Sequence, residues 1–173
     1  QDRLDYGFGT VVASPVAADA IVITGSRRNV TMWERWMDDV VELIRETTTP
    51  LYGICFGHQI IAHALGGKVE RAEEDWHFVA GVVDESGDAI IASFAHQEYV
   101  VDAGELDVIA SSDHCKIAAC KHPTRPIHTV QYHPEAVSKV LDAALACGDM
   151  NQEERSAYDD KRLTTDVSIA FNL

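Results

Sequence analysis

PLYGICFGHQ, residues 50–59, joins a short apolar run to a pattern typical of a helix. At its centre, G-x-C-x-G places Cys55 between two glycines at the expected strand-to-helix junction. A nucleophile on such a tight turn projects above the carboxyl end of its strand, and the glycines let neighbouring backbones approach without a Cβ clash. The N-terminus of the helix, near Phe56, also favours a thiolate. Taken alone, the pattern fits a buried structural cysteine as well as a nucleophile.

Alternating strand and helix patterns surround this turn. The β-branched run at 19–24 predicts a buried strand, and Thr31 and Glu34 have the spacing of a capping box before apolar residues at helical spacing. A second strand is predicted at 51–55, followed by a helix at 58–65 that ends at a glycine pair. This order predicts a parallel sheet with helices packed on its faces.

The pattern changes from Lys68 onward, where short strand-like runs alternate with polar or glycine breaks. We expect antiparallel strands at 77–84, 89–94, 107–112 and 116–120, a buried strand at 127–133, a helix at about 135–147 and a short surface helix within 151–163. The sequence therefore predicts an α/β fold of three layers. Its central sheet is mostly parallel, with helices on both faces and a few antiparallel strands.

Composition bounds the class of protein. The 173 residues are 46% hydrophobic, which suits one domain over 1–173 with an acidic C-terminal tail at 148–173. The net charge of −14 repels phosphate backbones, and no apolar run is long enough to span a bilayer. We expect neither nucleic acid nor a membrane as a partner, and a cytoplasmic location. The four cysteines do not indicate a disulfide framework without a secretory signal.

A second motif, VQYHPE at 130–135, places His133 and Glu135 just beyond the predicted strand at 127–133. Histidine is the natural base for a thiol, and a carboxylate two residues later can hold the other ring nitrogen. The carboxyl ends of parallel strands gather at one edge of a sheet, so Cys55 and His133 are expected to meet there. A lone loop histidine is usually structural, but its occurrence with the cysteine motif favours catalysis.

The stretch PLYGICFGHQIIAHALGG (50–67), together with VQYHPE, resembles the class I glutamine amidotransferases, the glutaminases with a Cys-His-Glu triad. The resemblance runs from about Asp19 to Glu135. It implies that Cys55 attacks the side-chain amide carbon of L-glutamine, that His133 transfers the proton and that Glu135 orients His133. Ammonia leaves, and water then releases glutamate from a glutamyl thioester. This chemistry requires no metal or organic cofactor.

The resemblance also implies the surrounding site. The oxyanion hole would use the N–H of Phe56 and a donor from the loop at 24–27, where Thr-Gly-Ser-Arg stands in place of the family's usual Gly-Gly-Pro. Ser26 takes the donor role there by alignment, beside Gly25. Gln59 is implied to contact the bound glutamine.

The segment FAHQEYV, 94–100, resembles the family's Ser-His-Gly segment, whose backbone holds the amino-acid head of glutamine. Gln97 and Glu98 are therefore predicted to bind substrate. Ala95 stands where a polar residue is common, which leaves recognition of the head group open. We expect His96 to be structural.

One further cluster, H-C-x4-C-x-H at 114–122, contains the residue types that bind zinc. Because KIAAC at 116–120 reads as a strand, its ligands would alternate between faces. The favoured interpretation is small core cysteines with surface histidines, and no metal site is predicted.

The aromatic residue after the nucleophile and the TGSRRNV loop at 24–30 resemble the glutaminases of GMP synthase most closely. The chain has no glycine-rich phosphate loop, so the resemblance implies an ATP-dependent synthetase in trans. Two alternatives stay open. One is a stand-alone γ-glutamyl hydrolase, and the other is a catalytically silent regulatory homologue. The second arises because the family's sheet begins with another strand–helix unit, for which GTVVAS at 9–14 is the sole strand candidate here.

Overall fold

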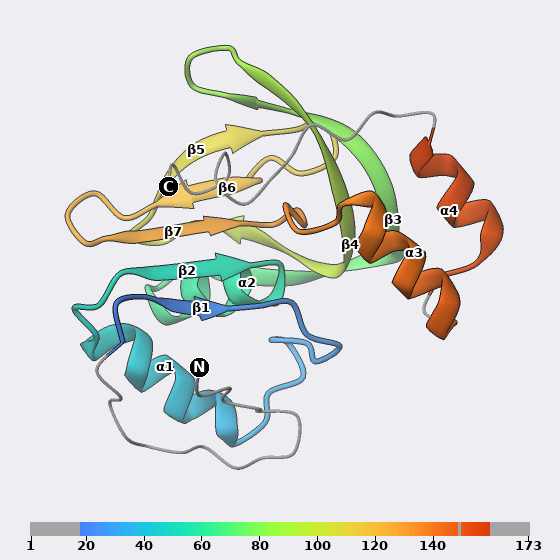
Figure 1. Cartoon of the computed structure of the whole chain (residues 1–173). Helices are drawn as coiled ribbons and strands as arrows, with labels where there is room; N and C mark the ends of the chain where they lie inside the picture. Colours follow the sequence, from blue (N-terminus) through green and yellow to red (C-terminus); the bar gives the residue numbers. More distant parts are fainter. Residues whose placement is uncertain (1–17, 149, 160–173) are drawn as a thin grey trace.

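A computed structural model describes residues 18–148 and 150–159 of the chain (Figure 1). The predicted strand at 9–14 and the tail beyond 159 lie outside these residues. The described elements, in chain order, are β1 (Ile21–Ile23), α1 (Trp36–Glu46), β2 (Leu51–Ile54), α2 (Phe56–Ala64), β3 (Lys68–Asp84), β4 (Ala89–Asp102), β5 (Asp107–Ser111), β6 (Ala119–Lys121), β7 (Ile127–Val130), α3 (Ser138–Cys147) and α4 (Gln152–Asp159).

These strands form one mixed sheet in the order β1-β2-β7-β6-β5-β3-β4. The strands β1, β2 and β7 pair in parallel, whereas every later pairing in this order is antiparallel. The α/β class is thus confirmed, but the sheet is not mostly parallel. The reason is that the chain after α2 continues through a hairpin and short reversals, which join neighbouring strands without the helical crossover that parallel pairing needs.

The strands β3 and β4 are much longer than the runs predicted at 77–84 and 89–94. They pair over most of their length as a curled ribbon, with register shifts near its charged start (Figure 1). The stretch 68–76 carries too many charged residues to be recognised as a strand. Pairing with β4 nevertheless gives its backbone the hydrogen bonds that the sequence pattern did not predict.

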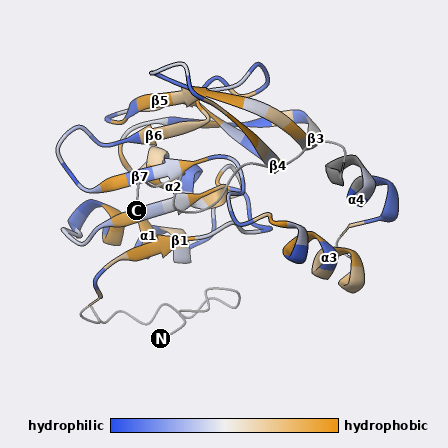
Figure 2. Cartoon of the chain, turned by 45° about the horizontal axis from the view of Figure 1, so that its top comes forward, coloured by the Kyte–Doolittle hydropathy of each residue, from blue (hydrophilic) through white to orange (hydrophobic). Residues whose placement is uncertain are grey.

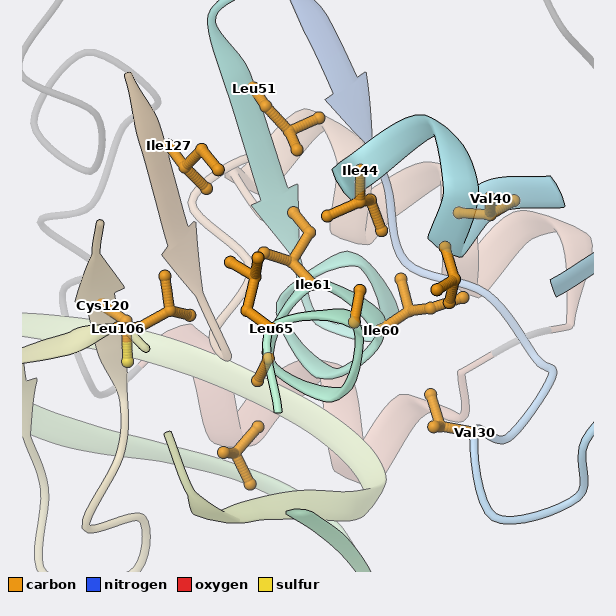
Figure 3. Close-up of a cluster of buried hydrophobic side chains, with 14 of the residues drawn as sticks. Val30, Val40, Ile44, Leu51, Ile60, Ile61, Leu65, Leu106, Cys120 and Ile127 are labelled. Carbon is orange, nitrogen blue, oxygen red and sulfur yellow. The ribbon is translucent and has the colours of Figure 1, made fainter. Parts of the chain in front are cut away.

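The largest hydrophobic cluster packs α1 and α2 onto one face of the parallel strands. Ile44 of α1, Ile60 and Ile61 of α2, Leu51 of β2 and Ile127 of β7 all belong to this cluster, which Figure 3 shows gathered around α2. All five of these side chains are almost completely buried. This packing fixes α2 against the ends of β2 and β7, and so places the turn at Cys55.

A second cluster lies on the opposite face, where Ile54 of β2 and Val130 of β7 meet Val82 of β3 and Phe94 of β4. The curled ribbon therefore covers part of the face that the three-layer prediction assigned to helices. Within the described residues, α3 and α4 instead lie beyond β3 and β4, on the far side of the molecule from α1 (Figures 1 and 2). None of the described helices is long and apolar enough to cross a bilayer.

The predicted capping box at the start of the first helix is wrong. Helix α1 begins at Trp36 after Arg35, without a side-chain cap. The Thr31 hydroxyl donates to the carboxylate of Glu98 on β4 instead. A long-range partner has replaced the local hydrogen bond that the spacing of Thr31 and Glu34 suggested.

Candidate active site

Cys55 sits on a strained turn between β2 and α2. Its φ of 53° and ψ of −104° make it the one non-glycine residue with positive φ in the described part of the chain. Such a conformation costs about 1–3 kcal/mol and persists only where the surroundings enforce it. Its N–H donates to Val130 O at 2.9 Å, and its carbonyl accepts the Gln59 N–H at 3.1 Å. The turn therefore ties the nucleophile candidate to β7 on one side and α2 on the other.

The flanking glycines explain how this turn is held. A Cβ on Gly57 would lie 2.0 Å from the carbonyl oxygen of Ile23 in β1, and one on Gly53 would lie 2.7 Å from the Gly57 backbone. Any side chain at Gly57 would force α2 away from the sheet. The two glycines of the motif are therefore required by close backbone contact.

His133 reaches the same place from the chain that follows β7. Strand β7 ends at Val130, earlier than predicted, because the backbone N–H groups of the following residues bond to other segments. The Gln131 N–H donates to Ala118 O, and the His133 N–H donates to Ser93 O, both at 2.8 Å. The Nδ1 of His133 donates to Glu135 Oε1 at 2.7 Å. That bond fixes the ring orientation and leaves Nε2 as the nitrogen available for a proton transfer.

Cys55 and His133 meet around Gly25. A Cβ on Gly25 would lie 3.0 Å from His133 Cε1 and 3.7 Å from Cys55 Cβ. Burial lowers the pKa of His133, but its contacts with the Cys55 sulfur and the Glu135 carboxylate outweigh burial and raise the pKa to about 10. This arrangement favours the imidazolium form of His133 beside the Cys55 sulfur. The structure thus brings together the three residues predicted as a catalytic triad.

The predicted oxyanion-hole residues border this group. Phe56 is the first residue of α2, and its N–H has no intrahelical acceptor because helical bonding begins with Gln59. Ser26 is exposed on the loop after β1, and its hydroxyl accepts the Arg28 N–H at 3.0 Å. Gly25 lies against both Cys55 and His133. Their roles as oxyanion donors stay predictions.

The side chains of the three predicted substrate-binding residues contact other parts of the protein. The Gln59 amide nitrogen donates to Glu98 O at 2.6 Å and to Gln131 Oε1 at 3.1 Å. Gln97 Oε1 accepts from Asn29 at 3.3 Å. The Glu98 carboxylate accepts from the loop after β1. Binding of glutamine by these residues stays a prediction. In the same segment, the backbone carbonyl of Ala95 accepts from the Cys55 thiol.

Sequence reasoning placed Ala95 in the substrate segment but did not predict that its carbonyl contacts Cys55, and it did not identify Gln131 or Thr31 as parts of this site. The Cys55 thiol donates to Ala95 O at 3.6 Å. Gln131 is completely buried and supports Gln59, and Thr31 supports Glu98. Each depends on a contact between residues far apart in the chain, for which a single sequence gives no local signal.

Two of the possible zinc ligands at 114–122 are cysteines packed in the hydrophobic core. Cys120 belongs to the first hydrophobic cluster and Cys115 to the second. Burial raises the pKa of each thiol to about 12. The Nδ1 of His122 accepts the backbone N–H groups of Thr124 and Arg125 at 3.1 Å. Across the described residues, no group of three or more histidine, cysteine, aspartate or glutamate side chains is arranged to hold a metal ion.

We expect iodoacetamide at about pH 6.5, well below the ordinary thiol pKa, to alkylate Cys55 before Cys147. His133, whose pKa is raised, lies beside the Cys55 sulfur and can accept its proton, whereas Cys147 is exposed near the end of α3, where its sulfur contacts Ala144 O. Cys115 and Cys120 should not react, because burial keeps them as thiols. Peptide mapping by mass spectrometry checks the order. Equal labelling of Cys55 and Cys147 contradicts the ion pair.

A family model described as glutamine amidotransferase class-I matches residues 10–148. Among curated proteins, a glutamine-hydrolyzing GMP synthase subunit from Methanocaldococcus jannaschii is 38% identical over 104 residues, 55% of this chain and 55% of that protein. The corresponding subunit from Methanopyrus kandleri is 38% identical over 106 residues, 54% of this chain and 57% of that protein. The matched segment thus spans about half the length of these relatives.

Solved structures share the fold at low identity. A glutamine amidotransferase from Thermotoga maritima superposes with a TM-score of 0.73 at 17% identity, covering 93% of this chain and 78% of that one. A protein from Thermoplasma acidophilum, described as a GMP synthase subunit, gives a TM-score of 0.62 at 23% identity, covering 82% of this chain and 70% of that one. At these identities, the likeness concerns the fold alone.

Proposed function

Because the chain belongs to the class I glutamine amidotransferase family, we propose that it hydrolyses the side-chain amide of L-glutamine and delivers ammonia to a separate ATP-dependent synthetase. One observation carries the proposal most strongly. Cys55, on a strained turn at the N-terminus of α2, lies beside a histidine that is itself bonded to Glu135. A structural cysteine needs neither the strain nor the imidazole.

In the proposed first half-reaction, the Cys55 thiolate attacks the amide carbon of glutamine. The carbonyl oxygen becomes an oxyanion, and the N–H groups of Phe56 and Ser26 are proposed to stabilise it. His133 then gives its proton to the leaving nitrogen, so that ammonia departs and a glutamyl thioester forms. Glu135 keeps the imidazole oriented through the bond to Nδ1.

In the second half-reaction, neutral His133 accepts a proton from water as the water oxygen attacks the thioester carbon. The second tetrahedral intermediate collapses, glutamate leaves, and the Cys55 thiolate with the His133 imidazolium is restored. Cys55 is buried, and this burial limits the access of bulk water to the Cys55–His133 pair. The electrostatic interaction between the two side chains is stronger as a result.

The acceptor of the ammonia is proposed to lie in the synthetase half of a GMP synthase. Support comes from relatives 36–38% identical that are named as glutamine-hydrolyzing GMP synthase subunits, and from the aromatic residue at position 56. The cytoplasmic location predicted from composition accords with this proposal and stays a prediction.

The direct test measures glutamate and ammonia released from glutamine by the purified chain, alone and with a GMP synthetase partner and its nucleotide substrates. We expect glutamine hydrolysis, with the largest rate when the synthetase is present. Cleavage of γ-glutamyl amines without glutamine hydrolysis would select the stand-alone hydrolase. Release of no glutamate under either condition would select the silent homologue.

Replacing Glu135 with glutamine is expected to move the alkaline limb of kcat/KM to lower pH by about one unit or more. The Glu135 carboxylate helps to raise the pKa of His133, and the imidazole must be protonated to release ammonia. Without the negative charge, His133 loses its proton at lower pH, so the active ion pair is lost at a lower pH than in the wild type. The alkaline limb reports the apparent pKa of the coupled Cys55–His133 pair.

A matched control is Glu105→Gln, because Glu105 is exposed and lies near His122, away from the Cys55 turn. Its pH profile should coincide with that of the wild type. An unchanged alkaline limb in Glu135→Gln would show that the carboxylate does not tune His133.

A further inference from the structure

A buried carboxylate joins the two segments that border Cys55. The Glu98 side chain is only 1% exposed and comes from β4. Its Oε2 accepts the Val30 N–H at 2.6 Å, and its Oε1 accepts the Thr31 N–H at 3.1 Å and the Thr31 hydroxyl. A buried carboxylate is costly unless donors surround it, and here the loop after β1 supplies them.

The neighbouring residues strengthen the same connection. Gln97 Oε1 accepts from the Asn29 side chain at 3.3 Å. The backbone carbonyl of Glu98 accepts from Gln59 Nε2 at 2.6 Å, and His96 Nδ1 contacts the same carbonyl at 2.7 Å. Further back along β4, the carbonyl of Ala95 accepts from the Cys55 thiol. The strand is thereby fixed to α2, to the Cys55 turn and to the loop.

The loop carrying the proposed oxyanion donor has two fixed ends. One end is β1, which finishes at Ile23, and the other is the pair Val30–Thr31 held by Glu98. Between them, Ser26, Arg27 and Arg28 are exposed. Only three residues separate Ser26 from Val30. Release of the second anchor therefore changes the position of the Ser26 N–H more readily than that of Cys55, which is held separately by β7 and α2.

We propose that Glu98 is a positioning residue that acts on the loop at 24–31, so that the loop's N–H donor faces the oxyanion formed at Cys55. This inference rests on the proposed function, and it assigns the Glu98 side chain to the loop, whereas the predicted contact of the segment 94–100 with glutamine was through the backbone. In this proposal, the Glu98 carboxylate accepts the hydrogen bonds that hold the loop in position. A glutamine at this position would turn one acceptor into a donor facing the loop N–H groups.

The test compares Thr31→Val with Thr31→Ser in the full chain, and adds Glu98→Gln. Thr31→Val removes the hydroxyl bonded to Glu98 while keeping a β-branched side chain. Thr31→Ser keeps the hydroxyl and should recover most of the lost activity. We expect Thr31→Val to lower kcat for glutamine about tenfold, less than the 10²–10³-fold typical of a lost oxyanion donor, and to change KM less. Glu98→Gln should lower kcat by more.

Two further measurements separate positioning from general damage. Alkylation of Cys55 by iodoacetamide forms no oxyanion, so its rate should stay within about twofold of the wild type in Thr31→Val. Amide hydrogen exchange of the segment 24–31 should increase in Thr31→Val and Glu98→Gln. Thr48→Val, at an exposed threonine in the segment after α1, is the control and should change none of these quantities.

The inference is overturned if Thr31→Val and Glu98→Gln keep wild-type kcat, if exchange of 24–31 does not increase, or if alkylation falls in parallel with kcat. Failure of the proposed function has a different signature, since the wild type itself then releases no glutamate. The exchange comparison still decides in that case whether Glu98 holds the loop.

Discussion

Cys55→Ser is expected to lower kcat for glutamine hydrolysis by about 10³-fold or more. A serine hydroxyl loses its proton far less readily than a thiol, so the pair with His133 would no longer hold a nucleophilic anion. The turn itself should survive, because its strain is maintained by bonds from the Cys55 backbone to β7 and α2. Glutamate release under saturating glutamine measures the change, and a thermal melt confirms the fold.

The matched control is Cys147→Ser, because Cys147 is exposed near the end of α3 and removed from the turn. That variant should keep wild-type activity. If Cys55→Ser retained a tenth of wild-type kcat, the thioester mechanism would be untenable, and another group would have to attack the amide. The comparison therefore tests the nucleophile assignment without depending on any partner.

Gly57→Ala should give the largest loss of stability. Its new Cβ would lie 2.0 Å from the Ile23 carbonyl oxygen and 2.8 Å from the Ile23 carbonyl carbon, both of which are backbone atoms. Overpacking a core costs typically about 1–3 kcal/mol, and a clash with backbone belongs at the upper end because no flexible side chain can move aside. We expect a loss of about 3 kcal/mol, which lowers Tm by roughly 6–12 °C.

Gly81→Ala provides the control, because a Cβ on Gly81 in β3 would meet no atom within 4 Å. Urea unfolding of the two variants and the wild type measures the difference in free energy. If Gly57→Ala unfolded at the same urea concentration as Gly81→Ala, α2 would have to be less closely packed on β1 than the structure indicates. A folded Gly57→Ala protein should also show reduced glutaminase activity, since α2 carries the N-terminus beside Cys55.

The first half of the fold could be predicted from the sequence because its signals are local. The strands β1 and β2, the helix α2 and the glycine-flanked turn each follow from the spacing of apolar residues and glycines within a few positions. The predicted burial of the first strand is wrong, because β1 lies at the edge of the described sheet and Val22 is 53% exposed. The antiparallel half of the fold was harder to predict from the sequence. The charged start of β3 forms a strand only because β4 pairs with it, and that pairing joins residues such as Lys68 and Asp102, which are far apart in the chain.

By itself, the sequence determined the α/β class, the sharp turn at Cys55 and the identity of the histidine and carboxylate that accompany it, because each is encoded by residues adjacent in the chain. Only the tertiary structure decided what Thr31 and Glu98 do. A hydroxyl three residues before a glutamate suggests a helix cap, yet the oxygen instead donates to a carboxylate 67 positions later. A buried charge must find its donors wherever folding brings them, and that requirement outweighed the local pattern.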